Sequence, residues 1–145
     1  MNWKREAEED LRKYTFMKNS LENTAERIKM LQNKAEAPHG GRIDSVPVHG
    51  GGTPAEDRLL NNIVERERLK ATHIAAKRLV KLMEKGLSAL DEKERRVIDL
   101  FYINKQKNHV ERLMEEWSYE QRQIYNIKDK ALYKYTISMY GLAEY

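Results

Sequence analysis

Residues 88–141 read SALDEKERRVIDLFYINKQKNHVERLMEEWSYEQRQIYNIKDKALYKYTISMYG, and this stretch determines the predicted fold. An apolar periodic run is followed by the polar break Asn104–Asn108, a short amphipathic run and a turn at Ser118–Glu120. The last run shows apolar residues at spacings of three and four. This pattern predicts three helices with a short turn between the last two. Such a turn is typical of a helix-turn-helix, whose second helix reads base edges in the major groove.

The final predicted helix has two different faces. Its apolar stripe is expected to pack on the two preceding helices, and its other side is expected to face solvent. The stripe consists of Ile124, Ile127, Ala131, Leu132 and Tyr135. The polar side consists of Gln121, Arg122, Tyr125, Asn126 and Lys128.

The first half of the chain is predicted to be two long helices joined by a linker. Residues 2–34 contain no Gly or Pro, and Ala7, Tyr14, Leu21 and Ile28 recur every seven residues, as in a coiled coil. Residues 37–52 are rich in Gly and Pro and are predicted to be a linker. The second helix is expected to start at a Thr53 capping box and to stop at Gly86.

The expected domain organisation follows from these boundaries. It is a long helix in 1–36, a linker in 37–52, a long helix in 53–86 and a helix-turn-helix domain in 87–145. The polar second helix needs a partner to be stable. That partner is either the first helix, folded back as an antiparallel hairpin, or another subunit. The overall prediction is an all-α protein, and its long helices are expected to support a homo-oligomer.

Bulk composition narrows the function classes. The chain has 145 residues, 34% of them charged, no cysteine and a net charge of +4. Its mean hydropathy is −0.85, and it has no run apolar enough to span a bilayer. The charged start, MNWKREAEED, is unlike a signal peptide, and the absence of cysteine agrees with a cytoplasmic protein. From Ser88 onward basic and acidic residues are matched, which predicts weak DNA binding by one copy.

Enzymatic and metal-binding functions are not expected. His39 and His49 have no Asp, Glu or Cys at ligand spacing. The acidic pairs Asp91-Glu92 and Glu115-Glu116 fall on predicted outer helix faces, where solvation explains them. The sequence also has no activated serine pattern and no phosphate loop. We therefore expect neither a cofactor nor a catalytic residue.

The C-terminal pattern resembles region 4 of sigma-70-type factors. The resemblance is carried by Leu87-Ser88-x-Leu90, by Glu94-Arg95-x-Val97-Ile98-x-Leu100-x-Tyr102, and by Lys130-Ala131-Leu132 in the last helix. The whole layout is similar to phage late transcription regulators of the RinA and ArpU kind. The chain differs in having Glu120 where sigma factors usually carry a capping Ser or Thr. Ser118 is an alternative cap.

The resemblance implies binding to double-stranded DNA at a promoter, with contact to bacterial RNA polymerase. It places the base-facing positions on Gln121, Arg122, Tyr125 and Asn126. Side-chain chemistry agrees, because Arg122 can contact guanine and Gln121 or Asn126 can contact adenine. The expected phosphate contacts are Arg112, Lys128, Lys130 and Lys134. Two alternatives remain open: a small terminase subunit that marks viral DNA for packaging, and a sigma-like protein that binds polymerase alone.

Overall fold

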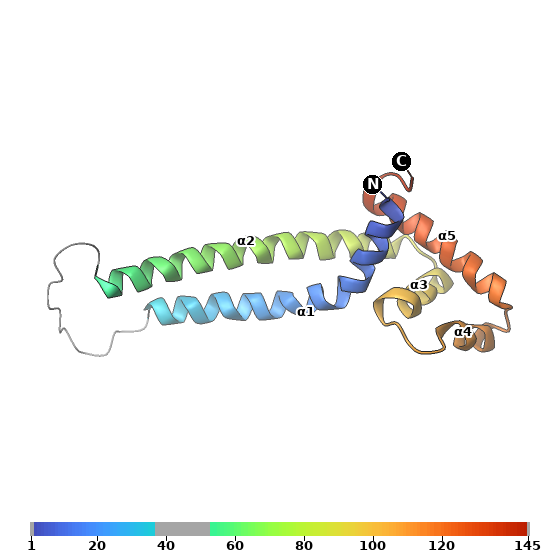
Figure 1. Ribbon diagram of the computed structural model, residues 1–145, viewed down its shortest axis with the longest axis horizontal. Coiled ribbons are helices and arrows are strands. Elements are labelled where there is room, and N and C mark those ends of the chain that lie inside the picture. Colours follow the sequence, from blue (N-terminus) through green and yellow to red (C-terminus); the bar gives the residue numbers. More distant parts are fainter. Residues whose placement is uncertain (1, 37–52, 145) are drawn as a thin grey trace. The chain divides into compact units, whose positions relative to one another are not determined.

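The computed structural model describes residues 2–36 and 53–144, and every regular element in this part of the chain is helical (Figure 1). The all-α fold class predicted from the sequence is confirmed. The expected linker at 37–52, with His39 and His49, lies outside the described residues. No helix in the described ranges combines the length and the apolar content needed to cross a bilayer. The elements are α1 (Trp3–Glu36), α2 (Pro54–Ser88), α3 (Glu92–Ile98), the π-helical turn η1 (Asp99–Ile103), α4 (His109–Trp117) and α5 (Gln121–Tyr140).

These elements form two compact units that share the two long helices. The core unit comprises residues 1–18 and 78–145, and the hairpin unit comprises residues 19–77. The division differs from the expected one, because the first turns of α1 belong with the C-terminal helices. Each unit is described separately below.

In the hairpin unit, α1 and α2 run antiparallel within one chain (Figure 1). Thr24 Oγ1 lies 2.7 Å from His73 Nδ1, and further along α1 the carbonyl of Leu31 accepts a hydrogen bond of 3.0 Å from Asn62 Nδ2. Position along α2 therefore falls as position along α1 rises. Of the two alternatives for the second helix, the structure has the intrachain hairpin.

The start of α2 follows the predicted capping box, but its end does not follow the prediction. The Glu56 N–H donates to Thr53 Oγ1 at 3.2 Å, and the Thr53 N–H donates to Glu56 Oε2 at 3.3 Å. At the other end the helix continues through Gly86 to Ser88, so the predicted stop at Gly86 is wrong. A Cβ at Gly86 would lie only 3.0 Å from Tyr135 Cε2. The glycine therefore permits close packing of α2 on α5.

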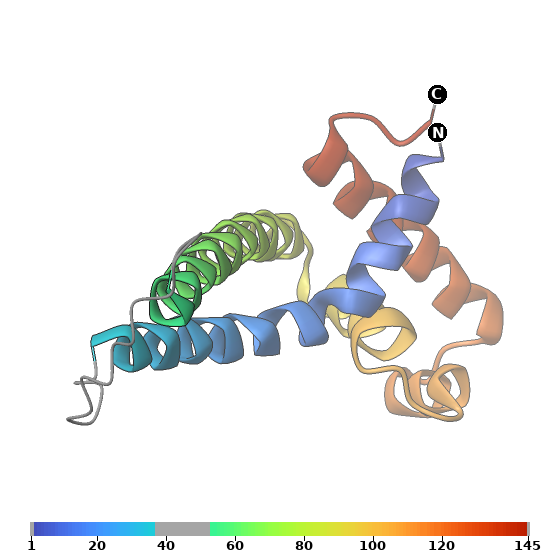
Figure 2. The ribbon, with the colours of Figure 1, turned by 60° about the vertical axis from the view of Figure 1, so that its left-hand side comes forward.

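The core unit has a first hydrophobic cluster where the beginning of α1 meets α5 (Figure 2). Trp3 and Tyr140 stack with ring centroids 4.9 Å apart, and the Tyr140 hydroxyl donates to Asp10 Oδ2. Burial, followed by the Asp10 carboxylate, raises the pKa of Tyr140. These contacts attach the start of α1 to the end of the chain. The buried members of the cluster are Ala7, Leu11, Leu87, Leu90, Ile98, Tyr102, Ala131, Leu132 and Tyr135.

A second cluster fills the space between α3, α4 and α5. Its buried members are Val97, Leu100, Val110, Leu113 and Ile124. The π-helical turn η1 closes with a 2.7 Å hydrogen bond from the Asn104 N–H to the Asp99 carbonyl. Within this turn Leu100 enters the second cluster and Tyr102 enters the first, while Phe101 touches both. The turn thus joins the two halves of the core.

Candidate nucleic-acid interface

The candidate interface is built on α4 and α5, which are joined by the turn Ser118–Glu120. Ser118 has a left-handed backbone (φ 54°, ψ 41°), and its N–H donates to the Met114 carbonyl, so it ends α4. Glu120 is extended and is the N-cap of α5. The alternative that Ser118 caps α5 is therefore wrong. A left-handed residue at the end of α4 reverses the chain within three residues and fixes where α5 begins.

The first turn of α5 is held by Gln123. Its side-chain oxygen accepts a 2.8 Å hydrogen bond from the Glu120 N–H, and its own N–H donates to the Glu120 carbonyl at 3.0 Å. One residue later, Ile124 is fully buried in the second cluster. The start of α5 is thus fixed both by capping and by packing, which orients the residues on its opposite face.

Three of the four predicted base-contacting residues have exposed side chains that are not bound by other described residues. Within the described ranges, no side-chain hydrogen bond or ion pair involves Gln121, Arg122 or Asn126, and all three are exposed. Tyr125 is also exposed, but the edge of its ring packs against Phe101, with centroids 5.8 Å apart and planes at 85°. The structure therefore brings all four residues to the N-terminal half of α5.

The predicted apolar stripe of α5 lies on the buried side. Ile124, Ala131, Leu132 and Tyr135 are buried, and Ile127 is half-buried against the second cluster. Since these residues anchor one side of the helix, the side carrying Arg122 and Asn126 faces outward.

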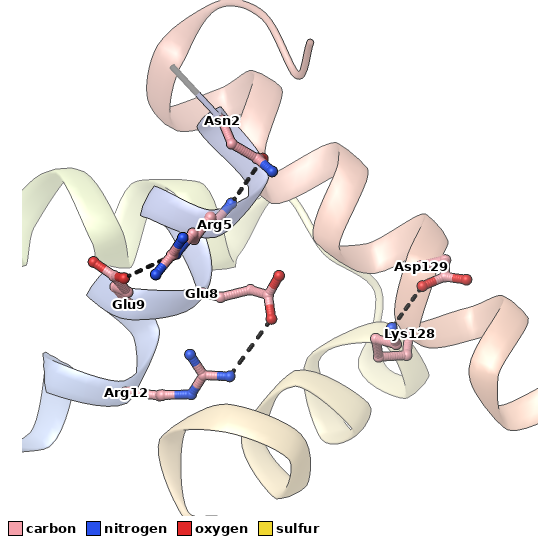
Figure 3. Close-up of polar contacts among 7 residues, drawn as sticks. All are labelled: Asn2, Arg5, Glu8, Glu9, Arg12, Lys128 and Asp129. Atoms are coloured by element: carbon pink, nitrogen blue, oxygen red, sulfur yellow. Dashed lines mark hydrogen bonds and ion pairs between the residues drawn. The ribbon is translucent and has the colours of Figure 1, made fainter.

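The predicted phosphate-contacting residues have different surroundings. Lys130 is exposed, and no ion pair involves it within the described part of the chain. Arg112 is exposed on α4, and its guanidinium donates to the side chain of Gln106. Lys128 is half-buried, and its Nζ lies 2.7 Å from Asp129 Oδ1 (Figure 3). The same Nζ lies 5.8 Å from the centre of the Tyr125 ring. Lys130 and Arg112 are the better placed of these three to reach a phosphate.

Lys134 has a structural partner. Its Nζ donates to Glu94 Oε1 at 2.9 Å, and the Glu94 side chain is only 4% exposed. The same Glu94 oxygen accepts from the Asp91 N–H at 3.2 Å, as part of the capping box that starts α3. Because a buried carboxylate needs compensation, Lys134 contributes to the stability of the core unit. Its contact with phosphate stays a prediction.

Acidic residues lie beside these cations. Asp129 shares the outer side of α5 with Arg122 and Asn126, and Glu111 precedes Arg112 on α4. Outside the interface, on α1, Arg5 pairs with Glu9 and Arg12 pairs with Glu8 (Figure 3), at 3.4 Å and 3.5 Å. The candidate interface therefore has few cations in excess, which agrees with the matched charge of the sequence after Ser88.

Comparisons of the chain with protein-family models, with curated proteins and with solved structures found no match.

Sequence reasoning missed two residues that hold the interface in place. Leu11 is fully buried in the first cluster, but it falls outside the heptad positions that were expected to pack. The sequence indicates its burial only through its position beside Ala7 and Asp10, which widens the side of α1 that faces the core. The other residue is Glu94, which the sequence indicated only as part of the sigma-like motif and which is the partner of Lys134.

Proposed function

We propose that the protein is a sequence-specific DNA-binding regulator of transcription in which α4, the turn and α5 act as a helix-turn-helix. The observation that carries this proposal is the outer side of α5. It presents Gln121, Arg122 and Asn126 without protein partners at the start of a helix whose opposite side is anchored in the core. Arginine pairs well with guanine, and asparagine or glutamine with adenine, in the major groove.

The arrangement around α5 supports a sigma-region-4-like reading of this domain. α3, α4 and α5 share one hydrophobic cluster, and only three residues separate α4 from α5. A recognition helix must be rigidly held to read bases, and Ile124 and Gln123 supply that rigidity. The resemblance to phage late regulators adds promoter DNA as the target and RNA polymerase as a partner.

A binding-site selection from random duplexes tests this function with the full chain. The selected duplex is then measured against a scrambled duplex by fluorescence anisotropy at one fixed salt concentration. Arg122→Ala should lower the preference for the selected site by about 5- to 150-fold, which corresponds to a bidentate contact of about 1–3 kcal/mol. Arg5→Ala is the matched control, because it also removes one positive charge, but from an exposed position on α1.

Other outcomes distinguish the alternatives. Equal binding of both duplexes by the wild-type protein would contradict a sequence-specific regulator. Selective binding only when RNA polymerase is present would support a polymerase-binding role. Lys130→Ala should weaken binding to both duplexes alike and reduce the salt slope by about 1, as expected for a phosphate contact.

A further inference from the structure

The hairpin unit leaves a row of apolar side chains uncovered on α2. We call Leu59, Leu60, Ile63, Val64 and Ile74 the outer stripe. Their relative exposures range from 41% to 60%. The spacing of four residues from Leu59 to Ile63 and from Leu60 to Val64 keeps them on one side, and Ile74 follows Ile63 by three turns. Glu67 and Lys70, which form an ion pair of 3.5 Å, lie on the same side between Val64 and Ile74. Single exposed apolar residues are common, but a cluster such as Leu59, Leu60, Ile63 and Val64 marks a contact surface.

The opposite side of α2, which faces α1, is unusually polar. Asn62 and His73 make side-chain hydrogen bonds across the hairpin. Between them, the Nε atom of Arg66 is buried and has no hydrogen-bond partner within the described ranges. In residues 19–36 and 53–77 no side chain is fully buried. A helix pair stable by itself would turn its apolar side inward. This hairpin unit instead leaves much of the apolar surface of α2 exposed.

We propose that the partner is a second copy of this chain, bound through the outer stripe with the two α2 helices antiparallel. A twofold symmetric contact requires a surface that complements itself. The charges of α2 meet that condition. Glu56 and Asp57 lie in its first turn, and Lys77 lies at the other end of the hairpin unit. In an antiparallel pair each acidic end faces the basic end of the other copy.

Side-chain sizes along α2 are also self-complementary. Leu60 and Val64 are large and four residues apart, and Ala71 and Ala75 are small, exposed and four residues apart. One antiparallel register places Leu60 against Ala75 and Val64 against Ala71 at the same time. Large side chains opposite small ones let two helices interdigitate. The same register brings Glu67 of each copy beside Arg68 of the other, close to the symmetry axis.

Light scattering and sedimentation of the full chain test the contact. The wild-type protein should have twice the monomer mass of 17.2 kDa. Val64→Glu should weaken dimerisation by more than about a hundredfold, because it buries an unpaired charge in the contact. Met30→Glu is the matched control, since Met30 is 62% exposed on α1 and lies outside the outer stripe. It should remain dimeric.

Loss of fold must be separated from loss of contact. Both tryptophans, Trp3 and Trp117, lie in the core unit, so an unchanged emission spectrum of the Val64→Glu variant would show that this unit is intact. A monomeric wild-type protein, or a Val64→Glu variant as dimeric as the wild type, would overturn the proposal.

Single cysteines test the orientation, because the natural chain has none. Near the symmetry axis, Glu67→Cys should form a disulfide between two copies of the same variant. Leu60→Cys should not do so alone, but should cross-link to an Ala75→Cys partner when the two variants are mixed. Efficient cross-linking of Leu60→Cys with itself would contradict the antiparallel arrangement.

Discussion

Replacing Leu11 tests whether the beginning of α1 is part of the core unit. Leu11 has no exposed surface and packs in the first cluster with Leu132 and Tyr135 of α5. Truncation of a fully buried leucine to alanine costs about 2–5 kcal/mol, and the site is closed on all sides, so we expect about 3 kcal/mol. Alanine keeps the helix propensity of α1, which restricts the effect to packing.

The expected loss is large enough to measure by fluorescence. For a domain of the size of the core unit, residues 1–18 and 78–145, each kcal/mol of lost stability lowers the melting temperature by about 4–8 °C. Leu11→Ala should therefore lower it by roughly 12–24 °C. Tryptophan emission follows the core unit, because Trp3 stacks on Tyr140 and Trp117 packs on the second cluster. Urea titration followed by the same signal gives the free energy of unfolding.

Phe16→Ala supplies the control for Leu11→Ala. Phe16 lies on the same helix in the same unit but is 76% exposed, so its removal should change the free energy of unfolding by less than about 0.5 kcal/mol. If Leu11→Ala were as stable as Phe16→Ala, the first turns of α1 would not belong to the folded core. A fragment of residues 87–145 with full stability would refute the same reasoning.

Two further substitutions test polar contacts of the core unit. Lys134→Met should lower the free energy of unfolding by about 1–2 kcal/mol. This is below the range for fully buried pairs because Lys134 is 42% exposed. In a double-mutant cycle, adding Glu94→Gln should recover part of this loss. Asp91→Ala should cost about 1 kcal/mol at pH 7 by removing the cap of α3, measured by urea titration. The hydrogen bond from the Glu94 N–H lowers the pKa of Asp91. That contribution is present above the ordinary carboxyl pKa of about 4 and is lost as pH falls below it, so the difference between wild type and Asp91→Ala should shrink in acid. Asp91→Asn should keep a cap that does not depend on pH in this range.

The features that could be predicted from the sequence depend on interactions between residues close together in the sequence. The capping box predicted at Thr53 needs two residues three positions apart, and both of its hydrogen bonds are present. The buried stripe of α5 follows from apolar spacings of three and four. Helical periodicity likewise placed Arg122 and Asn126 outward. In each case the controlling interaction lies within one or two helical turns, where sequence spacing is a direct measure of geometry.

The features that could not be predicted depend on contacts between distant segments. Asp10 meets Tyr140, 130 residues away, and no periodic pattern indicates this pairing. Gly86 has the local signal of a helix stop, but its packing against Tyr135 keeps it within α2. Lys134 has the spacing of a surface lysine, and only the fold brings it to Glu94. Tertiary contacts overrode the local signal at each of these positions.

The proposed dimer and the proposed DNA contact can be connected by the dependence of binding on salt. One copy offers few free cations, chiefly Arg112, Arg122 and Lys130, with Asp129 on the same side of α5. The slope of log affinity against log salt is about −0.9 per phosphate neutralised, so two copies bound together should show about twice the slope of one. Val64→Glu should therefore bind DNA with about half the wild-type slope while keeping its preference for the selected site, because Arg122 and Asn126 are untouched. An unchanged slope would mean that one copy makes all the phosphate contacts. It would contradict the idea that a second copy supplies the cations that a single copy lacks.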